Sequence, residues 1–192
     1  ATAVITVSDL TGSTDLSGIA NATATVNATV TGSIDITGNV HLGKVDTYTV
    51  SSGFTLTALA SQVTGLTVSG AGSLIVEALA AGTNLTNVNL VGLVTALVED
   101  DISITENGTL GVVDTYTVST NRTLTATADQ VDGIAVNGEG RLTVNGTATG
   151  ATDLSSLSAD VVDITGADLT NGSVTWMTVA AGDELRLSSA QA

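Results

Sequence analysis

The chain has 192 residues, 43% of them hydrophobic, with no Pro, no Cys, one His and a formal net charge of −15 at pH 7. That charge argues against binding to nucleic-acid phosphates or to an anionic membrane surface. The lack of Cys and of a second His excludes disulfides and ordinary zinc sites, and no apolar run approaches the roughly 20 residues of a membrane-spanning helix.

Short runs with apolar residues at every second position follow one another along the chain. They cover residues 5–7, 46–51, 54–58, 65–70, 73–77 and 101–106. A period of two predicts β-strands, and Gly, Asn or Asp separates runs that recur roughly every 8 to 12 residues. Good helix formers are scarce and Thr and Val are abundant, so helices are not expected. The sequence predicts an all-β chain.

The heptapeptide VDTYTVS occurs twice, starting at Val45 and at Val113, 68 positions apart. The two copies align without a gap as far as Val76 and Val144. Three related segments, TDLSGI, TNLTNV and TDLSSL, start at equal intervals, at Thr14, Thr83 and Thr152. The chain therefore contains an internal repeat of about 68 to 69 residues.

A third, shortened copy closes the chain. MTVAAGDELRLSSAQ, from Met177 to Gln191, aligns with YTVSSGFTLTALASQ, which begins at Tyr48. The opening AVITVSDLTGSTDL aligns with SLIVEALAAGTNL from Ser73. One array spans residues 1–192, with approximate units 1–44, 45–112, 113–176 and 177–192. Only the element VTGLTVSGAG is missing between its end and its own beginning. We expect the chain to be either part of a longer repeat protein or a subunit whose C-terminal end contacts the N-terminal end of the next subunit.

Small aliphatic residues suit a thin core, and a long ungapped repeat favours stacked coils over independent beads. We therefore predict a β-solenoid (parallel β-helix-like) built from the 68–69-residue repeats, with about 20 to 23 residues per coil and about three coils per repeat. The alternative is a tandem array of small antiparallel β-sandwich units. Tyr48, Tyr116, Trp176 and Met177 fall at equivalent or adjacent repeat positions, and we expect them to fill the core or its corners.

The string VDTYTVSSGFTLTA, continued by QVTGLTVSGAGSLIV, resembles the repeats of giant bacterial surface "β-strand repeat" proteins, which are S-layer-like and adhesin-like polypeptides. The resemblance covers nearly the whole chain. It implies an extracellular stalk, coat or fibre, which is often cation-dependent. The nonapeptide GGxGxDxUx, which binds calcium in many relatives, is absent.

The densest acidic stretch, VEDDISITENG, contains the candidate calcium ligands Glu99, Asp100, Asp101 and Glu106. Hard oxygen ligands at this density suit calcium, whereas the aligned stretch VTGSIDITGNV lacks them, so a solvated turn is the competing interpretation. The pairs Asp129/Asp132 and Asp160/Asp163 are similar candidates, and the lone His41 is expected in a surface turn. Regular Thr-x-Thr rows raise the further hypothesis of ice binding. No other cofactor is expected.

These observations predict a non-enzymatic structural protein of the bacterial cell surface that forms or extends a fibre, coat or stalk by head-to-tail stacking of β-repeats. The expected partners are further copies of the chain or neighbouring repeats of a longer one. The first alternative is a calcium-dependent adhesive module of a large adhesin, and the second is a carbohydrate-active β-helix enzyme with paired carboxylates. The opening ATAVITVSDL has no signal-peptide pattern, so an exported location implies a mature product or part of a longer protein.

Overall fold

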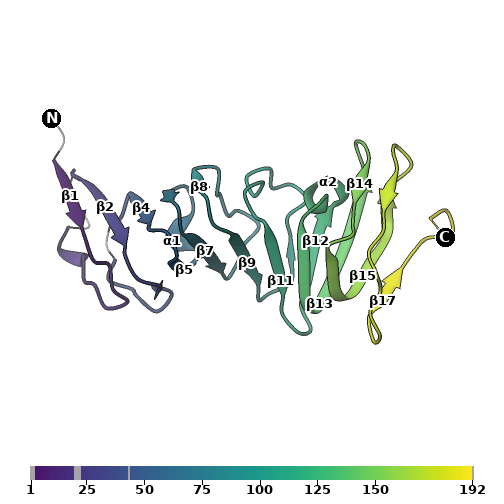
Figure 1. The fold of residues 1–192 in the computed structure, drawn as a ribbon, viewed down its shortest axis with the longest axis horizontal. Coiled ribbons are helices and arrows are strands. Elements are labelled where there is room, and N and C mark those ends of the chain that lie inside the picture. The colour runs from purple at the N-terminus through teal and green to yellow at the C-terminus, as the bar shows by residue number, and fades with distance from the viewer. Residues whose placement is uncertain (1–2, 20–22, 43, 192) are drawn as a thin grey trace. The chain divides into compact units, whose positions relative to one another are not determined.

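A computed structural model describes residues 3–19, 23–42 and 44–191, whose path is drawn in Figure 1. The chain divides into unit 1, Ala1–Glu77 with Thr83–Val94, and unit 2, Ala78–Gly82 with Thr95–Ala192. Within each unit, every strand pair among the described residues is parallel. The predicted β-solenoid is confirmed, and the alternative of antiparallel sandwiches is wrong.

Unit 1 arranges its strands in two parallel sheets. The first sheet contains β1 (Val4–Val7), β2 (Thr25–Val30), β4 (Thr47–Val50), β6 (Thr67–Gly70) and β8 (Val88–Leu90). The second contains β3 (Ile34–Asp35), β5 (Thr55–Leu59) and β7 (Ser73–Glu77). The 3-10 helix η1 (Ser17–Ile19) and the helix α1 (Ala60–Val63) are single turns at corners.

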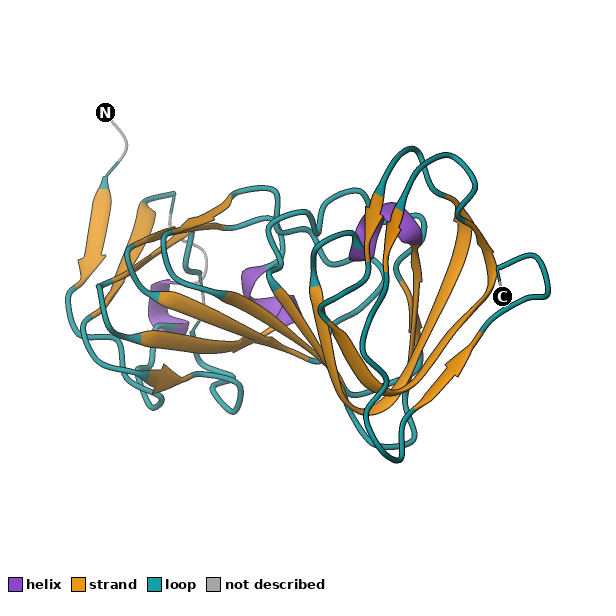
Figure 2. Cartoon of the chain, turned by 45° about the vertical axis from the view of Figure 1, so that its right-hand side comes forward, coloured by secondary structure: helices purple, strands orange, loops and turns teal. Residues whose placement is uncertain are grey.

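Unit 2 has the same parallel pairing, and two of its strands, Ala135–Thr147 and Leu157–Asp168, are longer than any strand of unit 1. Its elements are β9 (Val94–Val98), β10 (Ile102–Ser103), β11 (Thr115–Val118), β12 (Thr123–Thr127), α2 (Ala128–Val131), β13 (Ala135–Thr147), β14 (Thr152–Asp153), β15 (Leu157–Asp168), β16 (Val174–Thr175) and β17 (Glu184–Arg186). In repeat alignment, β13 covers the positions of both β6 and β7, and its register with β15 shifts between Gly138 and Arg141. Figure 2 shows strands dominating, with short helices in purple. No helix among the described residues is long and apolar enough to cross a membrane.

The length of one coil is given by the register between neighbouring strands. Asn27 lies opposite Thr47, which lies opposite Thr67, so these coils contain about 20 residues each. The other pairs range from about 18 residues between β5 and β7 to about 23 between β15 and β17. The predicted coil length of about 20 to 23 residues therefore agrees with most coils, although some coils are shorter.

The prediction of three coils per repeat is wrong, because one repeat advances three and a half coils. β1, β2, β4 and β6 lie on four successive coils of the first sheet of unit 1. The repeat copy of β1 is β7, which follows β6 on the same coil but lies in the second sheet. A full repeat therefore starts on the sheet opposite to its predecessor, whereas the shortened third copy advances three whole coils, because β17 follows β12 in one ladder through β13 and β15. The half coil arises because the repeat is longer than three coils of about 20 residues.

The core is a narrow column of small aliphatic side chains, as expected from the composition. Alternate residues of each strand point inward, and β2, for example, buries Val26, Ala28 and Val30 almost completely. The largest fully buried side chains are Tyr48 and Tyr116, which confirms their expected role as core fillers. Every described buried side-chain nitrogen or oxygen has a hydrogen-bond partner. Burial of each such aliphatic side chain contributes about 1.5–3 kcal/mol to stability.

Candidate functional site

The turn after each VDTYTVS-type strand has the same geometry in all three copies. Its central residues are Gly53, Asn121 and Gly182, with φ values of 80°, 60° and 107°. Gly and Asn tolerate this left-handed conformation better than other residues. In each copy the following residue donates its backbone N–H to the carbonyl two residues before the central one, at 3.0 to 3.2 Å. The shortened third copy therefore keeps this turn, although its residues 176–180 do not form the strand that β4 and β11 form in the first two copies.

A glutamine fixes the next corner of each copy. Nε2 of Gln62, Gln130 and Gln191 donates to two backbone carbonyls of the preceding coil, at 2.7 to 3.2 Å. Oε1 of each accepts the backbone N–H of the residue three positions earlier, at 2.8 to 2.9 Å. The carbonyls are those of Ile36 and Asn39, Ile104 and Asn107, and Ile164 and Ala167. These glutamine corners bind coil to coil.

The candidate calcium ligands have different partners and do not converge on one point. Glu99 accepts the backbone N–H of Ala78 at 2.9 Å, and Asp101 accepts that of Thr123 at 2.9 Å. Asp100 pairs with Arg122 at 3.5 Å, and Glu106 is exposed. The described residues contain no group of three or more His, Asp or Glu side chains that could hold a metal ion together. Calcium binding at this stretch stays a prediction.

The remaining acidic candidates also serve coil contacts. Asp129 and Asp132 accept backbone N–H groups of the next coil, at 3.0 and 2.6 Å. Asp163 lies between two cations, Arg141 at 3.4 Å and Arg186 at 3.8 Å. The hydroxyl of Thr165 lowers the pKa of Asp163, helped by both guanidinium groups. Asp160, like His41, is exposed at the surface.

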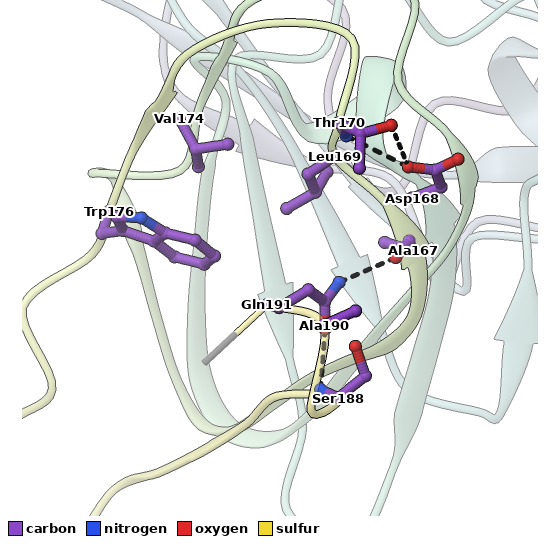
Figure 3. Close-up of a pocket in the computed structure, with 9 residues that line it drawn as sticks. All are labelled: Ala167, Asp168, Leu169, Thr170, Val174, Trp176, Ser188, Ala190 and Gln191. Carbon is purple, nitrogen blue, oxygen red and sulfur yellow. Dashed lines mark hydrogen bonds between the residues drawn. The ribbon is translucent and has the colours of Figure 1, made fainter.

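One of the hollows on unit 2 is an apolar groove at its last coil, drawn in Figure 3. It encloses about 330 Å³ and is lined by Leu169, Val174 and Trp176, with Ala190 and Gln191 along one side. Trp176 was expected to fill the core or one of its corners, but it lines the groove wall and 41% of its surface is exposed. Its neighbour Met177, at the Tyr48 position, is buried as expected.

Hydrogen bonds hold the rim of this end groove in place. Gln191 accepts the backbone N–H of Ser188 at 2.8 Å and donates to the carbonyl of Ala167 at 2.7 Å (Figure 3). Asp168 accepts both the hydroxyl and the backbone N–H of Thr170, at 2.7 and 3.1 Å, and these bonds lower its pKa. The polar groups at the rim are thus already paired, and the apolar floor suits contact with another polypeptide.

The glutamine corners and the end groove were not identified from the sequence. The alignment of Gln62, Gln130 and Gln191 was visible, but their partners are backbone carbonyls, which carry no sequence signal. The chain matches no family model, no curated protein and no solved structure.

Proposed function

We propose that the chain is a non-enzymatic structural protein of the bacterial cell surface that extends a fibre, coat or stalk by head-to-tail stacking of its repeats. The observation that carries this proposal is the pairing of β5 with β7 in unit 1, which is a template for a joint between two molecules. By repeat alignment, β17 is the copy of β5, and β1 is the copy of β7.

The template specifies the register of the joint. In the β5–β7 pair, Leu56 lies opposite Leu74, and both side chains are fully buried. The aligned residues are Leu185 on β17 and Ile5 on β1, and both are only half-buried. Adding β1 of one molecule to β17 of another would bring these two side chains together and complete their burial.

Both strands have an edge available for this addition. Among the described residues, β1 pairs only with β2, and β17 pairs only with β15. Open strand edges favour pairing with another chain, and a head-to-tail contact that does not close generates a filament.

The surface location is supported by composition. The chain lacks Cys, carries 19 acidic against four basic residues, and uses Thr, Val and Gly in the manner of the repeats that it resembles. A strong net charge also limits unspecific association of β-rich chains, so that association is left to matched edges.

The test is a proline placed on the free edge of β1. In a parallel strand, alternate residues direct their N–H and C=O groups to the same side. The carbonyl of Ala3 accepts the N–H of Thr25, so Ala3 and Ile5 face β2, and Thr6 faces away. Thr6→Pro removes a donor that the joint needs and leaves the β1–β2 bonds intact. Thr6→Ala keeps the donor and is the matched control.

Light scattering and negative-stain electron microscopy of the purified chains give the readout. We expect thin filaments from the original chain and from Thr6→Ala, and monomers from Thr6→Pro. Filaments from Thr6→Pro would rule out the proposed register. Monomers of the original chain at every concentration tested would overturn head-to-tail stacking of separate molecules.

A further inference from the structure

Two hollows of the same build lie at aligned places of the chain, one in each unit. The first measures about 260 Å³ and lies between residues 39–48 and the corner at residues 61–66 of unit 1. The second measures about 320 Å³ and lies between residues 107–116 and the corner at residues 129–134 of unit 2. Every residue that lines the first hollow has its aligned counterpart among those that line the second. The hollow therefore belongs to the repeat.

The walls of both hollows combine aliphatic side chains with amide groups that are already paired. The aliphatic residues common to both are Leu42, Val45 and Leu66 in the first hollow, and Leu110, Val113 and Ile134 in the second. Each wall also contains an asparagine and a glutamine, and both of these amides bond to backbone groups. The wall thus offers mainly an apolar surface to an occupant.

The tyrosine of each hollow carries a hydroxyl without a partner. Tyr48 and Tyr116 are only 1% and 2% exposed, and neither hydroxyl forms a hydrogen bond among the described residues. Every fully buried side-chain oxygen in that part of the chain has a partner, so each phenol oxygen keeps a small accessible surface. Both tyrosines line their hollows, so these oxygens are reached from there. An unpaired hydroxyl in an apolar setting costs free energy that a hydrogen-bonding occupant recovers.

The charges around the hollows favour a neutral occupant. Burial raises the pKa of both tyrosines to about 12, so each phenol keeps its proton at pH 7 and can donate it. The rim of the second hollow carries the exposed carboxylates of Asp129 and Asp132, whereas Ser61 takes the place of Asp129 in the first. Two carboxylates repel an anion, and a cation would meet no matching charge in the wall of the first hollow. An uncharged molecule suits both.

We propose that each hollow binds a small uncharged molecule with an apolar body and one oxygen atom, which accepts a hydrogen bond from the tyrosine hydroxyl. Cyclic ketones and ethers belong to this class. The apolar body packs against the three aliphatic side chains, and the single hydrogen bond fixes its orientation. This binding goes beyond a structural role, because an array of such repeats would hold the same ligand at regular intervals. It does not depend on head-to-tail stacking.

The test is equilibrium dialysis of the chain against radiolabelled cyclohexanone, which reads single chains and filaments alike. We expect saturable binding at two sites per chain, one for each tyrosine hollow. Labelled cyclohexanecarboxylate offers a similar ring with a negative charge, and it should bind about tenfold more weakly to a chain of net charge −15. Equal binding of the two probes would overturn the assignment of a neutral ligand.

The double variant Tyr48→Phe, Tyr116→Phe removes only the two hydroxyl groups. Because neither hydroxyl has a partner among the described residues, we expect the urea midpoint of unfolding to stay the same or to rise. The affinity for cyclohexanone should fall about fivefold, and each single variant should weaken one of the two sites. Trp176→Phe is the control, since it changes the end groove and neither hollow, and it should leave the binding unchanged.

The outcomes separate this proposal from the proposed function. Absence of saturable binding overturns it, and so does an affinity that the double variant leaves unchanged, because the hydroxyls would then take no part. A lower unfolding midpoint of the double variant would show that the hydroxyls already have partners within the fold, and would also count against it. Filament formation is scored on the original chain and bears only on the proposed function.

Discussion

The glutamine corners make a quantitative prediction about the stability of unit 2. Gln130 donates to the carbonyls of Ile104 and Asn107, at 2.7 and 3.0 Å, and accepts the N–H of Thr127 at 2.9 Å. Gln130→Leu keeps the approximate volume of the side chain and removes all three bonds. At about 1 kcal/mol per bond, the free energy of unfolding should fall by about 3 kcal/mol. Water has partial access to the backbone partners of Gln130 and can replace some of the lost hydrogen bonds, so we do not expect a larger loss.

Gln130→Glu separates the hydrogen bonds from packing. At pH 7 the carboxylate still accepts the N–H of Thr127, but it faces two carbonyl oxygens and has no donor, so the loss should at least equal that of Gln130→Leu. The two carbonyls raise the pKa of this carboxyl in the folded state. Protonation of the carboxyl that Gln130→Glu introduces restores a donor and with it part of the lost stability. This gain is complete below the unfolded-state pKa of that carboxyl and is lost as the pH rises through its folded-state pKa.

Urea unfolding followed by circular dichroism measures both effects. A loss below about 0.5 kcal/mol for Gln130→Leu would place the corner among ordinary surface positions and refute the reasoning. If the loss of stability caused by Gln130→Glu, measured against the original chain at the same pH, were equal at pH 7 and at pH 4, the assignment of the side-chain nitrogen as the donor to both carbonyls would be refuted.

Three further predictions concern titration and metal binding. Burial raises the pKa of Tyr48 and of Tyr116 to about 12, so phenolate absorbance should rise near that pH in the folded chain and near 10 in denaturant. The stabilisation from these two groups is complete below pH 10 and is lost as the pH rises toward 12. Hydrogen bonds from Ser155 and Thr170 lower the pKa values of Asp153 and Asp168. The stability that these two carboxylates contribute is therefore present above their unfolded-state pKa and declines as the pH falls through their folded-state pKa. Measuring the unfolding midpoint at a series of acidic pH values would show this decline. The calcium hypothesis for the VEDDISITENG stretch predicts stoichiometric uptake by calorimetry and a lower melting temperature in the presence of a chelator. An unchanged melting temperature and no uptake would refute it, and would agree with the separate partners of Glu99, Asp100 and Asp101.

The fold was predictable because alternation and repetition are local signals. Runs such as residues 54–58 and 73–77 appear as β5 and β7, and the shortened copy that was aligned from Met177 has the same turn as the first two. The number of coils per repeat was not predictable, since a period of two is the same on either sheet. Only the register shows that β1 and its copy β7 lie on opposite sheets.

The candidate site was less predictable for a different reason. Val179 and Val50 occupy aligned positions, in MTVAAG and YTVSSG, yet one is exposed and the other buried. Their difference depends on a strand that arrives one coil later, as Gly70 does for Val50. The acidic stretch does not form a cluster, because Glu99, Asp100 and Asp101 each contact a different backbone group or cation.

The half coil gained in a full repeat would give an array of such repeats the character of a two-fold screw. If the exchange of sheets seen between β1 and β7 continued along a longer array, any side chain specific to one copy would return on the opposite flank in the next. Differences in twist or width between the two sheets would then cancel over every pair of repeats. A thread built in this way has no preferred direction of bending, and whatever one flank displays, the other displays as well.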